Sequence, residues 1–334
     1  MIHSFSPAST TRRRLPVCIC TDAGYDPDDL LALVIAAIAL PLRLVVTSDE
    51  FGGGQRARLV RYLLNRCGRT SVVVVAGQEI EGAEARWVCD GLVPADFPPP
   101  SLPITGSIID AVRAVLGDSG RAAWIGQGPL TNLAHLYRAA PELAQRLVIT
   151  LMGGGLAERY RDSSRASHNP RLDPASARAI WSAPDLIMSL VTSDVTFTPE
   201  AEITRVSEVY QLLAADNAPP WARLVAAGYD RWFAKWTGSK AADPLALTVA
   251  AGLPCVQFDW ARVAIEHDAR MRLAPKGIKL RMSTGANYQS FHAWVTRIVR
   301  HALDFGIGLE PSLSGRVSST TGPTMAAAPL LARS

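Results

Sequence analysis

Short, strongly apolar segments recur along the N-terminal part of this chain, and longer segments with helical periodicity separate them. These runs lack the polar alternation of half-exposed strands, so they indicate strands buried on both faces of a sheet. Strands that alternate with helices form mostly parallel sheets. We therefore predict an α/β fold with a mostly parallel central sheet flanked by helices, and strands at Val17–Cys20, Leu42–Val46, Val72–Ala76, Ala122–Ile125, Leu147–Met152 and Leu186–Val191.

The pattern changes after about Pro199, where helical periodicity dominates before strand-like segments return. Beyond Gly306 the chain is rich in Ser, Thr, Gly, Pro and Ala, a composition typical of mobile tails. We predict one domain over residues 15–305, a flexible N-terminus over 1–14 and a flexible tail over 306–334. The later elements predicted in the domain are helices at Val206–Ala214, Trp221–Trp236 and Phe291–Leu303 and strands at Cys255–Phe258 and Val263–Glu266.

Composition and charge restrict the class of protein. The 334 residues are 48% hydrophobic and 19% charged, with a formal net charge of +4, which is typical of a folded globular protein. The one basic run, Arg12–Arg14, is short and is not accompanied by a basic patch with interleaved aromatic residues, so we expect no nucleic-acid partner. No segment reaches the ~20 uninterrupted apolar residues of a membrane span, so we expect no membrane partner.

The five cysteines are an odd number, and they have neither metal-ligand spacing nor the density of a secreted disulfide scaffold. The N-terminus contains no apolar core of signal-peptide length before Arg12. We therefore expect reduced thiols and a cytoplasmic location.

Four acidic residues directly follow the first predicted strand: Asp22, Asp26, Asp28 and Asp29. Carboxylates at this density repel one another, so solvation, protonation or a hard divalent cation must keep them together. The alternative is a solvated acidic turn that caps the next helix, since acids are favoured at helix starts. We favour a metal or polar-ligand site, because ligands of parallel sheets bind beyond the carboxyl ends of the strands.

Three later segments place polar residues after apolar runs or at helix starts, where loops distant in sequence can share one pocket. Gly126–Asn132 combines a Gly-Pro turn with Thr131 and Asn132. A long polar loop runs from Met152 to Asp173, and Asp243 opens an apolar helix. Taken singly, each segment also fits an ordinary helix start or cap.

The order of these motifs resembles that of the nucleoside hydrolases of the inosine-uridine preferring type. The acid cluster is followed by GPLTN at 128–132, MGG at 152–154, an HN-to-DP spacing over 168–174 and DPLA at 243–246. The resemblance extends from about Leu15 to Leu303. It implies a calcium-dependent N-ribohydrolase with a Rossmann-like parallel-sheet core, which acts on a nucleoside and, as relatives often do, forms a homodimer or homotetramer.

Matched to the family's DxDxxxDD motif, Asp22 is implied to be a calcium ligand that also positions or deprotonates the attacking water. Asp29, Asp243 and the backbone carbonyl of Thr131 complete the implied Ca²⁺ ligands, and oxygen donors of this kind suit that ion. Asp28 is implied to bind a ribose hydroxyl and Asn169 the sugar.

The motif contains two extra residues around Asp26-Pro27, so the assignment of the sugar-binding acid between Asp26 and Asp28 stays open. Cys20 replaces the first motif aspartate. Ser167 replaces a glutamate two residues before Asn169, which indicates altered recognition of the ribose 5′ end.

A histidine that many relatives carry before the late aspartate, as a leaving-group acid, is Ala242 here. Possible substitutes, each also open to a structural role, are His168, Tyr229 and Lys240. Asp49 and Glu50 could face the pocket or cap a helix. Trp87 and Asp90 could help to form a stacking wall, although a core position for Trp87 is the stronger interpretation.

Taken together, the sequence predicts hydrolysis of the N-glycosidic bond of a ribonucleoside or analogue, through an oxocarbenium-like transition state that needs an activated water, oriented hydroxyls and negative charge. The alternative is a nucleoside- or sugar-binding protein of the same fold with weakened catalysis. A phosphatase with an aspartate nucleophile is disfavoured, because the nucleophile position is Cys20.

Overall fold

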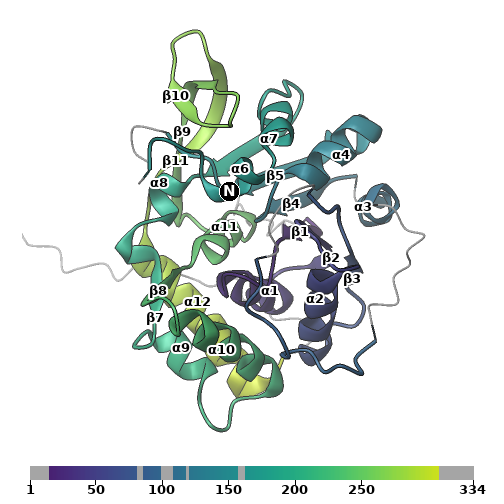
Figure 1. Ribbon diagram of the computed structural model, residues 1–334, viewed down its shortest axis with the longest axis vertical. Coiled ribbons are helices and arrows are strands. Elements are labelled where there is room, and N and C mark those ends of the chain that lie inside the picture. Colours follow the sequence, from purple (N-terminus) through teal and green to yellow (C-terminus); the bar gives the residue numbers. More distant parts are fainter. Residues whose placement is uncertain (1–14, 81–85, 99–107, 118–119, 157–161, 308–334) are drawn as a thin grey trace, which may run out of the picture.

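The computed structural model describes residues 15–80, 86–98, 108–117, 120–156 and 162–307 (Figure 1). The predicted flexible N-terminus, 1–14, lies outside these ranges, as does the predicted tail, 306–334, from residue 308 onward. The strands are β1 (Val17–Thr21), β2 (Leu42–Thr47), β3 (Val73–Val75), β4 (Ala122–Gly126), β5 (Leu147–Met152), β6 (Ile187–Val191), β7 (Glu202–Thr204), β8 (Gly238–Lys240), β9 (Val256–Ile265), β10 (Met271–Leu273) and β11 (Ile278–Ala286).

The helices alternate with the strands in the first part of the chain and dominate the later part. They are α1 (Asp28–Ala39), α2 (Gln55–Arg66), α3 (Ile108–Leu116), α4 (Thr131–Ala139), α5 (Pro141–Ala144), α6 (His168–Leu172), α7 (Pro174–Trp181), α8 (Ser193–Thr196), η2 (Pro199–Ala201, a 3₁₀ turn), α9 (Glu208–Leu213), α10 (Pro220–Phe233), α11 (Ala242–Ala250) and α12 (Tyr288–Phe305).

A nine-stranded sheet in the order β10-β9-β11-β6-β5-β4-β1-β2-β3 forms the centre of the molecule. Strands β3, β2, β1, β4, β5, β6 and β11 run parallel, and β9 and β10 pair antiparallel at one edge. The six predicted N-terminal strands are confirmed to within one or two residues. The mostly parallel sheet flanked by helices is therefore also confirmed.

Helices cover both faces of this sheet (Figure 1). One apolar core joins β1 and β2 to α1, α2, α10, α11 and α12, and a second joins β4, β5 and β6 to α3, α4 and α7. Every residue of α1 is buried, since this helix packs between the sheet and the outer helices. The short acidic turn before α1 is consequently held between two packed elements.

The C-terminal edge differs from the sequence prediction. The two predicted strands at 255–258 and 263–266 are parts of one strand, β9, which pairs along its length with the unpredicted β11. Trp260 is 57% exposed and the middle of β9 carries polar residues, because this hairpin extends beyond the layer of helices. In the described part of the chain, no helix combines the length and apolar character needed to cross a bilayer.

Candidate metal and sugar site

The acidic turn lies where β1 ends and α1 begins, at the carboxyl edge of the parallel strands. Gly24 in this turn has a φ of +120°, and a Cβ there would lie 2.1 Å from Cζ3 of Trp87. Trp87 also contacts Phe51 edge to face, with ring centroids 5.4 Å apart, and packs against the apolar core. These contacts agree with a core position for Trp87, and its ring packs directly against the acidic turn.

Three carboxylates from two helices meet at the centre of the site. Asp28 and Asp29 occupy the first turn of α1, Asp243 occupies the first turn of α11, and one oxygen from each lies within 4.8 Å of the others. All three residues are at most 4% exposed. The structure therefore brings two predicted metal ligands, Asp29 and Asp243, together with Asp28, the predicted sugar-binding acid.

Burial and mutual repulsion raise the pKa values of these carboxyls. Burial, with the charges of Asp26 and Asp29, raises the pKa of Asp28 well above its usual range. Burial, with the charges of Asp28, Asp29 and Asp22, does the same to the pKa of Asp243. Burial raises the pKa of Asp29 to about 6, even though Thr21 donates a hydrogen bond to its Oδ1. Negative charge at this density favours a bound cation.

The donor atoms fit a hard divalent cation such as Ca²⁺, which takes carboxylate and carbonyl oxygens. Oδ1 of Asp243 is buried and has no hydrogen-bond partner, an arrangement that is costly for a carboxylate unless a ligand supplies one. The other carboxylates are held in place: the backbone nitrogen of Asp243 donates to Oδ2 of Asp28 at 3.1 Å. These residues are therefore suited to hold the ion that the sequence implies.

Asp22 lies beside this cluster but is not one of the three closely grouped carboxylates. The loop after β4 packs against it so closely that a Cβ on Gly128 would lie 3.0 Å from its Oδ1. Burial and the charge of Asp29 raise the pKa of Asp22 well above its usual range. Asp22 is consequently a largely buried carboxylate next to the cluster, in a position suited to a general base.

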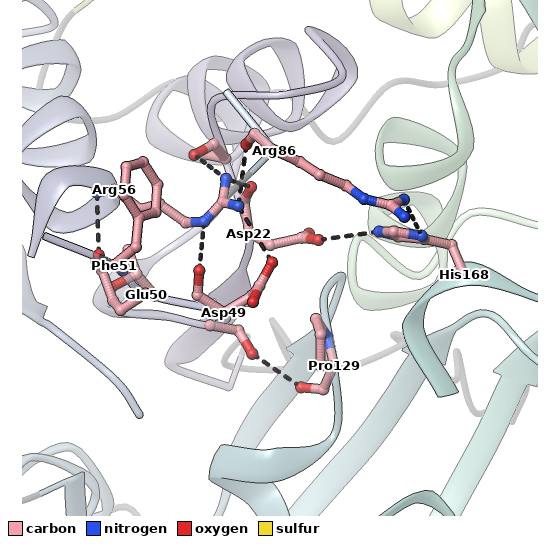
Figure 2. Close-up of polar contacts among 11 residues, drawn as sticks. Asp22, Asp49, Glu50, Phe51, Arg56, Arg86, Pro129 and His168 are labelled. Atoms are coloured by element: carbon pink, nitrogen blue, oxygen red, sulfur yellow. Dashed lines mark hydrogen bonds and ion pairs between the residues drawn. The ribbon is translucent and has the colours of Figure 1, made fainter. Parts of the chain in front are cut away.

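Arg56 of α2 holds the backbone around Asp22 (Figure 2). Its guanidinium is 1% exposed and donates to the carbonyl oxygens of Asp22 and Ala23, to the carbonyl and carboxylate of Asp49, and to the carbonyl of Arg86. Three loops distant in sequence are thus joined by one buried cation. Arginine suits this position because its five donors lie in a rigid plane.

The predicted alternatives for Asp49 and Glu50 are distinguishable by their contacts. Glu50 accepts hydrogen bonds from the backbone nitrogens of Phe51, Arg56 and Ala57 and from Oγ1 of Thr47, so it caps the start of α2. Asp49 has a φ of +52° and pairs with Arg56 at 3.2 Å. Both carboxylates therefore have structural partners, and the predicted substrate contact of Glu50 stays a prediction.

A chain of hydrogen bonds connects the sugar-binding candidate Asn169 to the acid cluster. Nδ2 of Asn169 donates to the carbonyls of Gln127 at 2.7 Å and Met152 at 3.2 Å. Nε2 of Gln127 donates to the carbonyl of Asp243 at 3.1 Å, while its buried Oε1 has no partner. The starts of α6 and α11 are thereby held at a fixed separation beside the cluster.

The side chains of Thr131 and Asn132 have structural partners. Oγ1 of Thr131 donates to Oδ2 of Asp173 at 2.7 Å, and Asp173 caps α7 by accepting from the backbone nitrogen of Ser176. Asn132 donates to the carbonyl of Thr47 and accepts from the backbone nitrogen of Gln78. The metal contact predicted for Thr131 uses its backbone carbonyl, which these side-chain bonds do not involve.

His168, at the start of α6, faces Asp22 (Figure 2). Its Nε2 lies 3.9 Å from Oδ2 of Asp22, and Nη1 of Arg86 lies 2.9 Å from its Nδ1. Burial and the nearby charge of Arg86 lower the pKa of His168 to about 3, so the ring is neutral. Its neighbour Ser167 is buried and its hydroxyl accepts a hydrogen bond from the backbone nitrogen of Gly154 at 2.8 Å.

Asp26 contacts Asp28 directly, because its Oδ1 accepts a hydrogen bond from the backbone nitrogen of Asp28 at 3.4 Å. Oδ1 of Asp26 also accepts a hydrogen bond from the hydroxyl of Ser239, and burial raises its pKa to about 6. The hydroxyl of Tyr229 is fully buried on this side, and burial with the charges of Asp28 and Asp26 raises its pKa well above its usual range. Lys240 instead pairs with Glu202 at 2.6 Å.

Cys20 and Ala242 occupy the positions at which the resemblance implies an aspartate and a histidine that acts as the leaving-group acid. Cys20 is buried, receives a weak hydrogen bond from Asn132 at 3.5 Å, and burial raises the pKa of its thiol to about 12. Ala242 is 4% exposed and apolar. Both positions are therefore electrically neutral.

Sequence reasoning did not identify Arg56, Gln127 or Arg86 as parts of the site. Gln127 lies within Gly126–Asn132, the segment with the Gly-Pro turn that was predicted to share the pocket. Its place in that segment was the signal that could have identified it. Arg56 follows a run of glycines, and Arg86 precedes a tryptophan, without any pattern that distinguishes them from solvated arginines.

The fold and the site define an α/β protein with a buried cluster of carboxylates, suited to a cation, at the carboxyl edge of a parallel sheet. A family model described as inosine-uridine preferring nucleoside hydrolase matches residues 17–292. The chain belongs to this family, as the order of its motifs predicted.

Individual relatives are distant. Uridine nucleosidase of Saccharomyces cerevisiae is 24% identical over 221 residues, which cover 60% of this chain and 63% of that protein. The pyrimidine-specific ribonucleoside hydrolase RihA of Salmonella enteritidis is 26% identical over 224 residues, covering 64% of this chain and 69% of that protein. The chain thus spans less than two thirds of the length of the yeast relative.

Solved structures share the fold. The crystal structure of an inosine-uridine preferring nucleoside hydrolase from Bacillus anthracis superimposes with a TM-score of 0.68, covering 86% of this chain and 99% of that chain at 16% identity. The nucleoside hydrolase fold predicted from the sequence is confirmed.

Proposed function

We propose that this protein hydrolyses the N-glycosidic bond of a ribonucleoside or a close analogue, with Ca²⁺ as its cofactor. The observation that carries the proposal is the buried group of Asp28, Asp29 and Asp243, whose oxygens lie within 4.8 Å of one another in a member of the nucleoside hydrolase family. When bound, the ion supplies positive charge that lowers the pKa of a water and holds sugar hydroxyls.

Asp22 accepts the proton of the attacking water in this proposal. Its carboxylate lies beside the cluster, where a general base can reach a water held by the ion; in the metal-free protein, burial and the charge of Asp29 raise its pKa. Gly128 and Arg56 fix its position from two sides. General-base catalysis of this kind contributes roughly 10²- to 10⁴-fold to a rate. The predicted ligands Asp22, Asp29, Asp243 and the carbonyl of Thr131 hold the metal.

In this proposal the sugar lies between the acid cluster and the polar residues at the start of α6. Asp28 and Asn169 bind its hydroxyls, with Ser167 and His168 on the side of α6 and Asp26 on the side of Ser239. Negative charge around the anomeric carbon stabilises the oxocarbenium-like transition state. The bond to the base breaks, a bond from the water oxygen to the anomeric carbon forms, and the base departs with a proton.

A binding protein with weakened catalysis is the second candidate. It is favoured by Ala242, a buried apolar residue at the position before Asp243, which cannot donate a proton to the leaving base. Tyr229 stays a candidate donor because its buried hydroxyl has no hydrogen-bond partner, but burial and the charges of Asp28 and Asp26 raise its pKa and so make it a weaker acid.

The relatives' names direct the choice of substrates. Uridine and other pyrimidine nucleosides come first, followed by inosine. A role in purine or pyrimidine salvage, a homodimeric or homotetrameric assembly and a cytoplasmic location complete the proposal.

The experiment measures release of free base and reducing sugar from a panel of nucleosides, with Ca²⁺ and with chelator, for the natural protein and Asp22→Asn. Turnover that chelator abolishes and that falls at least about 10²-fold in Asp22→Asn supports the hydrolase. Nucleoside binding without turnover identifies the binding protein. If no nucleoside is bound or cleaved, both candidates are wrong.

A further inference from the structure

Arg86 crosses above Asp22 to reach His168 on the opposite side of the site (Figure 2). The 2.9 Å contact joins Nη1 of Arg86 to Nδ1 of His168. A guanidinium can only donate, so Nδ1 accepts and the proton of the neutral ring is on Nε2. Two different side chains therefore present N–H groups at the same edge of the site.

In the part of the chain that the structure describes, Arg86 forms no ion pair with a carboxylate. Its neighbour Arg56, by contrast, pairs with Asp49. A partly buried guanidinium is usually matched by an anion, because carboxylates and phosphates fit its planar donors. The charge of Arg86 acts on Asp49, whose carboxylate pairs instead with Arg56, so the planar donors of Arg86 are left for an anion that arrives with a ligand.

The position of Arg86 is fixed by its backbone. Its carbonyl accepts from Nη2 of Arg56 at 3.1 Å, and the next residue, Trp87, packs on Gly24. The backbone nitrogen of Val88 donates to the carbonyl of Gly24 at 2.9 Å, and Nη1 of Arg231 donates to the carbonyl of Val88 at 2.8 Å. The guanidinium is consequently presented from an anchored segment.

The opposite sides of the site carry opposite charge. Asp28, Asp29 and Asp243 form the acidic side, whereas Arg86 and the neutral His168 bring a positive charge and N–H donors to the other side, where Oδ2 of Asp22 lies 3.9 Å from Nε2 of His168. Ser167, next to His168, adds only a hydroxyl. A substrate with hydroxyls at one end and an anion at the other matches this distribution.

We propose that Arg86 and His168 bind a phosphate on the sugar, so that the substrates are ribonucleoside 5′-monophosphates. This inference rests on the proposed function, which engages the 2′ and 3′ hydroxyls with the acidic side and leaves the 5′ position for a substituent. His168 directly precedes Asn169, the sugar-binding candidate, which places the subsite at the sugar. A phosphate carries about −1.5 to −2 charges and three acceptor oxygens for these donors. The products are free base and ribose 5-phosphate.

The test compares kcat/KM for uridine with that for uridine 5′-monophosphate, and for inosine with inosine 5′-monophosphate. We expect the monophosphates to be preferred by about tenfold or more, and Arg86→Gln to reduce this preference by a similar factor. Arg86→Lys keeps the charge without the planar donors and retains part of the preference. Arg113→Gln, which removes an equal charge from an exposed pair with Asp110, leaves the preference unchanged.

Binding to the Asp22→Asn variant, measured by calorimetry, gives a readout independent of turnover. Tighter binding of the monophosphate, weakened by Arg86→Gln, supports the inference. Equal or better use of the unphosphorylated nucleosides overturns it and leaves the proposed function intact. Preference for orotidine over uridine, without preference for the monophosphate, places the anion on the base and also overturns it. If neither series is bound or cleaved, the proposed function itself has failed.

Discussion

The backbone nitrogen of Asp243 donates a 3.1 Å hydrogen bond to Oδ2 of Asp28, although 215 residues separate the two along the chain. This bond joins the first turns of α1 and α11, which pack against each other in one apolar core. Because both helices start at the carboxyl edge of the sheet, their acids meet only when the whole sheet has assembled. The cluster is thus a product of the fold and, without a cation, a source of repulsion within it.

Asp243→Asn tests this relationship. The amide keeps the backbone bond to Asp28 and removes one negative charge, so the metal-free protein should gain on the order of 1 kcal/mol in its free energy of unfolding. The increase in Tm on adding Ca²⁺ should be abolished, since a metal ligand is lost. Thermal unfolding with Ca²⁺ and with chelator measures both effects. The exposed Asp216→Asn is the control, and an unchanged Ca²⁺ response in Asp243→Asn would contradict the assignment.

The stabilisation by Ca²⁺ should depend on pH. Burial raises the pKa values of Asp26 and Asp29 from 3.8 to about 6, so these groups contribute stability below about pH 4 that is lost as pH rises through about 6 in the metal-free protein. As pH rises through about 6, the carboxylate of Asp29 becomes available to a metal and protons compete for it less. The Ca²⁺-induced rise in Tm should therefore be larger at pH 7.5 than at pH 5.

His168 has the opposite effect on the pH dependence of stability. Its pKa is lowered from 6.5 to about 3, so its contribution to the free energy of unfolding is lost as the pH falls from 6.5 to about 3. Its ring is neutral with and without metal over most of that range, so its contribution cancels in the difference between the two Tm values. Matched melting curves with Ca²⁺ and with chelator at each pH provide this difference. A Ca²⁺ effect that is constant from pH 5 to 7.5 would disprove the competition.

Arg56→Lys should destabilise the protein strongly. Lysine cannot reach the carbonyls of Asp22 and Arg86 and the carboxylate of Asp49 together, so buried acceptors lose their partners. Breaking a buried pair of this kind costs roughly 3–5 kcal/mol. Chemical unfolding measures the loss, and Arg66→Lys, on the exposed side of the same helix, should stay within about 0.5 kcal/mol of the natural protein. Equal stability of the two variants would refute the role of Arg56.

The sheet could be predicted from the sequence because its central strands are buried on both faces. Val17–Thr21 and Leu147–Met152 are therefore nearly continuous apolar runs. Strand β11 escaped prediction, since Lys279 and Arg281 alternate with apolar residues on a hairpin that is only partly covered. A strand is therefore easiest to predict from its own residues where both of its faces are buried.

The acids of the site were predictable from their density and their places at strand and helix ends. The bond between Asp26 and Ser239 was not, because Ser239 lies 213 residues further along the chain. The buried position of Arg56 was not predictable either, since the carbonyl oxygens that accept its hydrogen bonds lie on three other loops. Such partners meet only through the tertiary structure.

Gly128→Ala should impair catalysis more than folding. The added Cβ would lie 3.0 Å from Oδ1 and 3.1 Å from the backbone nitrogen of Asp22, so the loop or the carboxylate must shift by a few tenths of an ångström. A small displacement of a catalytic group can cost up to about 10²-fold in rate, because the reacting atoms lose their alignment.

The matched control is Gly285→Ala, whose Cβ would meet only the flexible end of Gln257 at 3.3 Å. We expect kcat for the released base to fall roughly 10- to 100-fold in Gly128→Ala, with Tm within a few degrees of the control. Full activity in Gly128→Ala would show that the water-activating group is not Asp22. If a fall in Tm accounts for all the lost activity, Gly128 is needed only for folding. This loop would then not explain the position of Asp22.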